Sequence, residues 1–327
     1  MPFDPFAKAR IGKTNLRISR LGIGTAPLGG WPAPVPASVG IGTIRRAWEK
    51  GIRYFDTAPF YGSGQSETYI GKALEGLPRS QFHLSTKAGR LLVPGEDPRS
   101  LYHDAMPFTA VFDFSARGVE QSLAESSERL GFSADIVYLH DPDHHQSEAM
   151  ETAYPKLAEL RDEGRIKAIG VGMNWVEPLE RFAEEGEFDV FLLAGRYSLL
   201  EQTALDRLFP VMAEKGMSVV AGGVFNSGLL IDPRRGSMYD YAAAPDDVVV
   251  KAQRLAMVCG KFGVPLRAAA LQFAAAHPLV ASVIVGARTV AEIDDTLELC
   301  ALAIPHELWT KLKEDELIRA DAPVPGN

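Results

Sequence analysis

The sequence predicts a single-domain (β/α)8 barrel, or TIM barrel, that spans residues 1–327 and has long loops on one rim. Eight short apolar runs recur from residue 18 almost to the end of the chain. Most of these runs are apolar throughout, which is typical of parallel strands buried on both faces. The stretches between them have the pattern of helices, and no change in composition marks a linker. A closed parallel barrel is the economical arrangement of such a series.

The first predicted element is a β-hairpin over residues 9–20, with its turn at Gly12-Lys13-Thr14, which closes one end of the barrel. The eight barrel strands are predicted within the apolar runs 18–25, 53–58, 82–87, 136–140, 168–173, 190–197, 218–222 and 282–286.

Helix signals occupy the segments between these runs. We expect Ser38 to be the N-cap of a helix that ends at Gly51. Residues 117–130 and 148–163 have helical patterns, and a glycine follows each of them. Pro178 falls in a first helical turn, where proline is tolerated.

Two long segments interrupt the regular alternation, and each follows a predicted strand. Residues 88–114 and 226–244 are rich in proline, glycine and aromatic residues, and we expect loops without regular structure. Loops of this length on the C-terminal rim of a barrel are usually functional. An open, doubly wound sheet is the alternative fold. No G-x-G-x-x-G motif follows an early strand, which disfavours it.

Charge and cysteine content narrow the class of protein. The net charge of -8 disfavours nucleic acid and anionic membrane as partners and favours a small-molecule substrate. Cys259 and Cys300 are far apart, which fits a reducing compartment rather than a disulfide framework. Ligand spacing for a metal is absent from the sequence, as are a signal segment and an apolar run of the ~20 residues that a membrane span needs. We expect a cytoplasmic protein, either a monomer or a small homo-oligomer.

Polar residues lie at the ends of three consecutive predicted strands. Asp56 ends the second strand and Tyr61 follows it, while Lys87 ends the third and His140 the fourth. Taken singly, each has an ordinary structural explanation, such as a helix cap or a surface lysine. Taken together at one rim, they suit hydride transfer, in which the cofactor carries two electrons and the protein handles one proton.

Each of these side chains has an expected role. Tyr61 gives or takes the proton, and a neutral His140 orients the substrate oxygen. Asp56 holds Lys87 charged. A phenol with a pKa near ~10 is a poor acid or base at neutral pH, so we expect the Lys87 ammonium to lower the pKa of Tyr61.

These four residues resemble the catalytic tetrad of the aldo-keto reductase superfamily, in order and in position. The segment from Phe55-Asp56-Thr57-Ala58 to Tyr61-Gly62 is similar to the family signature around its aspartate and tyrosine. The similarity extends over almost the whole chain and implies an NAD(P)-dependent oxidoreductase.

The resemblance also implies cofactor-binding residues on several strand ends. They are Gly24, Thr25, Asp56, Asn174, Arg196, Phe225, Ser227, Gly228, Leu229, Gly286, Ala287, Arg288, Glu292 and Asp295. Met173 and Gly222 depart from the family pattern beside the nicotinamide. Glu292 stands where NADP-preferring members carry a basic residue, and a carboxylate repels a 2′-phosphate. We therefore expect NAD, with NADP as the alternative because Arg288 lies nearby.

Within the family, the segments 225–230, 239–241 and 259–273 are similar to sugar 1-dehydrogenases acting on L-fucose and other D-threo-aldoses, and to pyridoxal 4-dehydrogenase. This implies oxidation of an anomeric hydroxyl to a lactone, or of the pyridoxal hemiacetal to 4-pyridoxolactone. The expected substrate contacts come from the tetrad and from aromatic side chains. They are Tyr61, His140, Trp31 and Trp175, with Phe60, Tyr102 and Phe225 as further candidate walls.

Two alternatives belong to other functional classes. Lys87 could be the nucleophile of a Schiff-base barrel aldolase. The chain could also be a subunit that binds a dinucleotide without catalysis, although an intact tetrad disfavours that reading.

Overall fold

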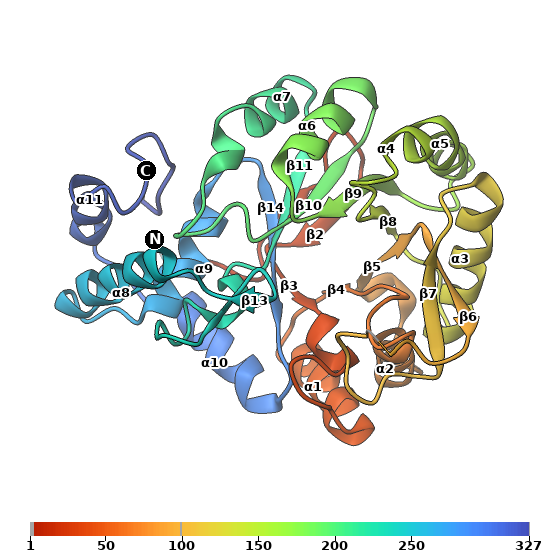
Figure 1. Cartoon of the computed structure of the whole chain (residues 1–327), viewed down its shortest axis with the longest axis horizontal. Helices are drawn as coiled ribbons and strands as arrows, with labels where there is room; N and C mark the ends of the chain where they lie inside the picture. The colour runs from red at the N-terminus through yellow and green to blue at the C-terminus, as the bar shows by residue number, and fades with distance from the viewer. Residues whose placement is uncertain (1–2, 99, 327) are drawn as a thin grey trace.

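The computed structural model describes residues 3–98 and 100–326, and within them eight parallel strands form a closed barrel (Figure 1). Strand β14 pairs with β3 and closes the sheet. Each predicted apolar run overlaps one barrel strand, so this prediction is confirmed. In order around the barrel, the strands are β3 (Leu21–Gly24), β4 (Tyr54–Asp56), β5 (His83–Ala88), β8 (Ile136–His140), β9 (Ala168–Met173), β10 (Val190–Ala194), β11 (Ser218–Gly222) and β14 (Val280–Gly286).

Helices surround the barrel (Figure 1). Ser115 caps α3, because its hydroxyl accepts a hydrogen bond from the backbone N–H of Gly118. Ser38 is not the N-cap of α1, which begins one residue earlier, after Pro36. The main helices are α1 (Ala37–Glu49), α2 (Gln65–Leu74), α3 (Ala116–Leu130), α5 (Tyr154–Asp162), α6 (Val176–Glu185), α7 (Leu208–Glu214), α8 (Asp246–Lys261), α9 (Leu266–Ala276), α10 (Val290–Ala301) and α11 (His306–Glu314).

The predicted N-terminal hairpin is confirmed as an antiparallel pair, β1 (Lys8–Arg10) and β2 (Arg17–Ser19). Its turn contacts the start of two barrel strands. Gly12 has a φ of 49°, and a Cβ there would lie 2.5 Å from the backbone oxygen of Asp189. The Gly12 N–H donates to the Ser218 hydroxyl at 2.8 Å. Glycine is required at this turn because of both the conformation and the close approach.

Both long segments follow barrel strands as predicted, but neither is structureless. After β5, strands β6 (Arg90–Pro94) and β7 (Phe108–Phe112) form an antiparallel hairpin. Valine, leucine and phenylalanine in these stretches favour strands over loops. After β11, a short pair forms between β12 (Met238–Tyr239) and β13 (Ala242–Ala243). The hairpins place side chains from both insertions beside the strand ends.

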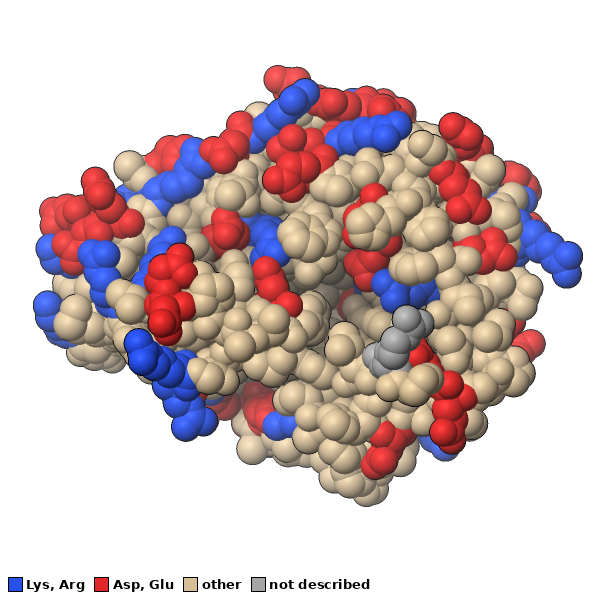
Figure 2. Space-filling model, viewed as in Figure 1, with Lys and Arg blue, Asp and Glu red and all other residues tan. Residues whose placement is uncertain are grey.

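The surface carries charged side chains of both signs, as the composition of the chain leads us to expect. Figure 2 shows acidic and basic side chains interspersed over one face, which is hollowed near its centre. Among the described residues, no helix is both long and apolar enough to cross a membrane. Over the same residues, no group of three or more His, Cys, Asp or Glu side chains could hold a metal ion.

Candidate active site

Asp56 and Lys87 form a buried ion pair at the rim of the barrel. The Lys87 Nζ donates to Asp56 Oδ2 at 2.8 Å and to the backbone oxygen of Thr57 at 2.9 Å. Both charged side chains are only 2% exposed. Strands β4 and β5 pair with Asp56 opposite Ser85, and Lys87 shares the face of Ser85 because side chains alternate along a strand. The strand register therefore brings the two charges together.

A chain of hydroxyl groups continues from Asp56 into the barrel interior. Ser85 Oγ donates to Asp56 Oδ1 at 2.7 Å, and the Tyr54 hydroxyl lies 2.9 Å from Ser85 Oγ and 3.3 Å from the Tyr138 hydroxyl. Burial raises the pKa of Asp56, while Lys87 and Ser85 oppose that rise. The sequence analysis missed this chain. Its signal is the spacing of two residues from Tyr54 to Asp56 and from Ser85 to Lys87.

Tyr61 lies on the loop after β4, beside Lys87 and His140. The Lys87 Nζ is 4.7 Å from the centroid of its ring. Its ring centroid lies 5.8 Å from that of His140, edge to face. Burial, followed by the Asp56 carboxylate, raises the pKa of Tyr61 well above its usual range. The expected lowering of this pKa by Lys87 is therefore wrong for the structure, because Asp56 pairs with the Lys87 charge and burial opposes ionisation.

His140 ends β8 and is buried beside Tyr61. Burial, then the charges of Arg90 and Lys87, lower the pKa of His140 well below its usual range. A neutral imidazole results at physiological pH, as expected from the sequence. Such a ring can donate one hydrogen bond to a substrate oxygen.

A pocket opens at this rim beside Asp56 and Tyr61. Glycines lie at several strand ends around it, and at Gly223, where φ is 60°, a Cβ would lie 2.9 Å from the Gly195 nitrogen. Together with the Asn174 amide, this open floor suits a flat ring such as nicotinamide. Eight predicted contacts line the pocket: Gly24, Trp31, Asp56, Tyr61, Tyr102, Asn174, Ser227 and Gly286.

Arg196 and Trp175 lie next to each other, outside the lining of this pocket. Arg196 donates to both carboxylate oxygens of Asp240, at 2.9 and 2.6 Å. Its guanidinium lies 5.3 Å from the centroid of a Trp175 ring that is 48% exposed. Neither residue lines the pocket described above, and Arg196 fastens the turn that carries Asp240. The cofactor contact of Arg196 and the substrate contact of Trp175 therefore stay predictions.

Other predicted cofactor residues have structural partners. Asp295 forms an ion pair with Arg267 of α9 at 2.5 Å, which holds two helices together. The Thr25 hydroxyl donates to the backbone oxygen of Asp56 at 3.0 Å and ties β3 to β4. Leu229 and Ala287 are fully buried in the core.

The start of α10 is capped by its own side chains. Glu292 accepts a hydrogen bond from the Arg288 backbone N–H at 2.7 Å, and the Thr289 hydroxyl accepts one from Glu292 N–H. A carboxylate therefore stands at the helix N-terminus, where an anion would otherwise be favoured. Around residues 225–228, Phe225 packs against the core and Gly228 has a φ of 95°, so this segment forms a tight turn after β11.

The second insertion supplies a side chain over the pocket that the sequence analysis did not assign. Tyr241 lines the pocket, and its ring centroid lies 5.3 Å from that of Trp31. Asp240 and Tyr241 both have positive φ, 49° and 63°, which is uncommon for residues other than glycine. The Arg196–Asp240 ion pair holds this strained turn over the pocket. Tyr102, from the first insertion, lies 6.3 Å from Tyr61 between ring centroids.

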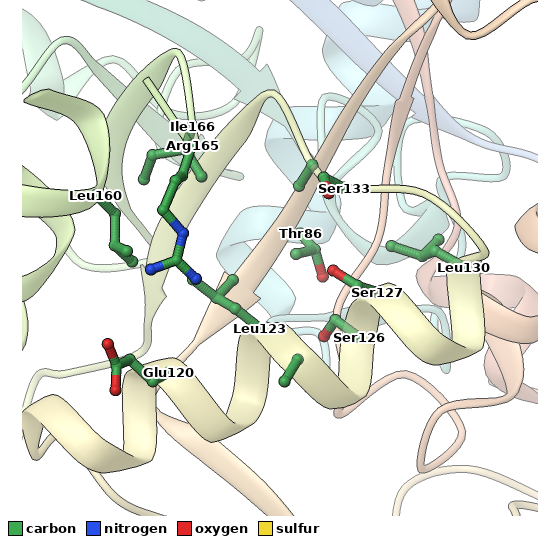
Figure 3. Close-up of a pocket in the computed structure, with 12 residues that line it drawn as sticks. Thr86, Glu120, Leu123, Ser126, Ser127, Leu130, Ser133, Leu160, Arg165 and Ile166 are labelled. Atoms are coloured by element: carbon green, nitrogen blue, oxygen red, sulfur yellow. The ribbon is translucent and has the colours of Figure 1, made fainter. Parts of the chain in front are cut away.

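A second crevice lies outside the barrel, between α3 and the segment that follows α5 (Figure 3). Leu123 and Ser127 of α3 and Arg165 line it. Thr86 also borders it, on the opposite face of β5 from Lys87, and donates to Glu67 at 2.7 Å. The crevice contains no member of the tetrad and is not a candidate for the active site.

Comparison with known proteins gives one family. The model of the aldo/keto reductase family matches residues 20–316. A D-threo-aldose 1-dehydrogenase of Pseudomonas sp is 41% identical, over 93% of this chain and 96% of its own. A pyridoxal 4-dehydrogenase of Microbacterium luteolum is 38% identical, over 95% of this chain and 98% of its own. The solved glycerol dehydrogenase of Gluconobacter oxydans shares the fold, with a TM-score of 0.72 and 24% identity over 98% of this chain and 97% of its own. The chain thus belongs to the aldo/keto reductase family and is an NAD(P)-dependent oxidoreductase.

Proposed function

We propose that the protein oxidises the anomeric hydroxyl of an aldose of the L-fucose or D-threo type to a lactone, with NAD as the preferred cofactor. The observation that carries the chemistry is the cluster of Tyr61, neutral His140 and the Lys87–Asp56 pair beside one pocket. The substrate class rests on the similarity to D-threo-aldose 1-dehydrogenase.

Bound NAD supplies the hydride acceptor. His140 donates a hydrogen bond to the substrate oxygen and orients the hydroxyl that reacts. In the oxidative direction Tyr61 first loses its own proton, and the phenolate then takes the hydroxyl proton as the carbon loses its hydride; in the reverse direction the phenol gives that proton back. The Lys87 ammonium stabilises the negative charge of the phenolate, while Asp56 fixes the ammonium in place.

The preference for NAD rests on the charge at the start of α10. Glu292 is held there by its hydrogen bond to the Arg288 N–H. A 2′-phosphate at that position would meet a carboxylate, whereas a ribose hydroxyl could donate to it. Arg288 is partly buried and lies next to this site, so NADP use at lower efficiency is compatible with the proposal.

Pyridoxal is the second candidate substrate, because a relative of 38% identity is a pyridoxal 4-dehydrogenase. Pyridoxal closes to a hemiacetal and so presents the same hydroxyl group as a cyclic aldose. A Schiff-base aldolase does not fit the site: Lys87 is almost fully buried and donates to Asp56 and Thr57.

The test is an initial-rate panel of aldoses and pyridoxal, each with NAD and with NADP. We expect reduced nucleotide to form fastest with NAD and a D-threo-aldose, and the lactone to accumulate in equal amount. Turnover of pyridoxal alone would select the second candidate. No oxidation of any aldose with either nucleotide would refute the proposed function.

A further inference from the structure

An ion pair outside the tetrad lies directly beside His140. Arg90, the first residue of β6, donates to Asp141 Oδ2 at 2.6 Å, and Asp141 follows His140 in the chain. The same carboxylate oxygen lies 3.6 Å from His140 Nε2. The Arg90 guanidinium stacks between two rings, 4.2 Å from the centroid of Phe60 and 4.5 Å from that of Phe112. The first insertion thus delivers a fixed positive charge to the end of β8.

This arrangement costs stability. The Arg90 and Asp141 side chains are 13% and 33% exposed, and partly buried charges lose hydration. Asp141 also has a φ of 46°, a conformation that costs a residue other than glycine about 1 kcal/mol or more. The proposed proton transfer uses neither side chain. Backbone strain and a partly buried ion pair next to a catalytic residue point to a function in the same reaction.

The pair also lies close to the reacting atoms. Burial is the main cause of the raised pKa values of Tyr61 and Tyr102; the charge of Asp141 adds to both rises and that of Arg90 opposes them. A substrate oxygen that hydrogen-bonds to His140 Nε2 would sit about 3 Å from that atom. Asp141 Oδ2 is 3.6 Å from the same atom, so a neighbouring hydroxyl of the substrate is within its reach.

We propose that Arg90 and Asp141 form a subsite for the substrate hydroxyl on the carbon next to the one oxidised. A hydroxyl both donates and accepts, and the pair offers a carboxylate acceptor and a guanidinium donor side by side. The proposal rests on the proposed function, since it assumes an aldose, and it adds a reason for selecting polyhydroxylated substrates.

The size of the effect follows from the chemistry of the contact. A hydrogen bond to a charged group contributes ~1.5–3 kcal/mol, which corresponds to about 10- to 100-fold in kcat/KM. We expect the wild-type enzyme to favour an aldose over its 2-deoxy analogue by about this factor. Asp141→Ala should lower kcat/KM for the aldose and leave that for the 2-deoxy sugar nearly unchanged, so the ratio falls toward one.

The experiment measures kcat/KM for both sugars in the wild-type enzyme, Asp141→Ala and Asp141→Asn. Asparagine keeps an acceptor oxygen and should retain part of the ratio; it also provides the same readout if the alanine variant does not fold. Asp143→Asn is the matched control. It removes a carboxylate from the same loop, but one that pairs with His144 and not with Arg90. NAD affinity is measured for every variant.

The outcomes separate this subsite from the broader assignment. A wild-type enzyme that oxidises both sugars equally, or variants whose rates fall equally on both, would show that the ion pair merely anchors the hairpin, and would overturn the subsite alone. A wild-type enzyme that oxidises no aldose would overturn the proposed function, and the subsite with it.

Discussion

Replacing Tyr61 with phenylalanine removes one oxygen atom and tests the proton-transfer role directly. The ring contacts are kept: Lys87 Nζ lies 4.7 Å from the ring centroid, and the His140 and Tyr102 centroids lie at 5.8 and 6.3 Å. Because no apolar contact is lost, the free energy of unfolding should change by less than about 1 kcal/mol. A loss of activity in Tyr61→Phe would therefore report chemistry rather than folding.

The expected loss follows from the burial of the site. General acid–base catalysis contributes about 10²- to 10⁴-fold, or ~3–5 kcal/mol of barrier. A loss within this range is expected, because the phenylalanine ring offers no proton donor or acceptor beside the buried Asp56–Lys87 pair. NAD binding should remain close to that of the wild-type enzyme.

The assay compares the initial rate of NADH formation with the dissociation constant for NAD. Tyr102→Phe is the control, as it removes a second phenol from the same pocket and should cost less than about tenfold. A Tyr61→Phe enzyme that retained more than a tenth of the wild-type turnover, or that lost cofactor affinity while still turning over, would refute the role assigned to this residue.

Three further predictions concern charge. Glu292→Arg should raise the ratio of kcat/KM for NADP to that for NAD. It should also cost ~1 kcal/mol of stability, because the hydrogen bond to the Arg288 N–H is lost. If Glu292→Gln gives the same cofactor ratio as Glu292→Arg, this position does not contact the ribose. Lys87→Met should lower the free energy of unfolding by about 3–5 kcal/mol, because it leaves the buried Asp56 carboxylate without a partner. Denaturant titration of the double variant Lys87→Met, Asp56→Asn should show that part of this loss is recovered. Since the pKa of His140 is depressed from 6.5, the unfolded chain takes up its proton first, so stability should fall as pH drops below about 6.5. Thermal unfolding of His140→Gln should show a flatter fall over that range, and an unchanged slope would contradict the buried neutral ring.

Strand ends were predictable because local pattern alone determines them. A parallel strand buried on both faces must be apolar, so the runs around Phe55 and Leu139 mark β4 and β8 without knowledge of their partners. Once the strands alternate with helices, their C-terminal ends share one rim. The proximity of Asp56, Lys87 and His140 then follows from topology.

The contacts that the two insertions make with other segments were not predictable in the same way. Arg196 and Asp240 are 44 residues apart in the chain, and Arg90 and Asp141 are 51 apart. Each pair joins a loop to a strand end or to another loop, so no periodicity in the sequence relates its members. The sequence shows these charged residues, but it does not show which of them pair, because the pairing depends on how the hairpins fold back over the rim.

The direction of the Tyr61 pKa shift was also mispredicted, because the sequence did not show how closely Asp56 pairs with the Lys87 charge. The structure nevertheless indicates how the four residues can act together. An ammonium has three N–H donors, and among the described residues Asp56 and Thr57 accept from Lys87 at 2.8 and 2.9 Å. These bonds fix the amine with its remaining donor capacity beside Tyr61, whose ring centroid is 4.7 Å away. Burial favours the neutral phenol at rest, so oxidation requires Tyr61 to lose its proton first, and the phenolate then meets an ammonium already in place. In the reductive direction the phenolate forms as Tyr61 gives its proton to the substrate oxygen. Electrostatic stabilisation of this kind acts mainly on the charge that develops in the transition state, so a raised resting pKa and a catalytic role for Lys87 are compatible.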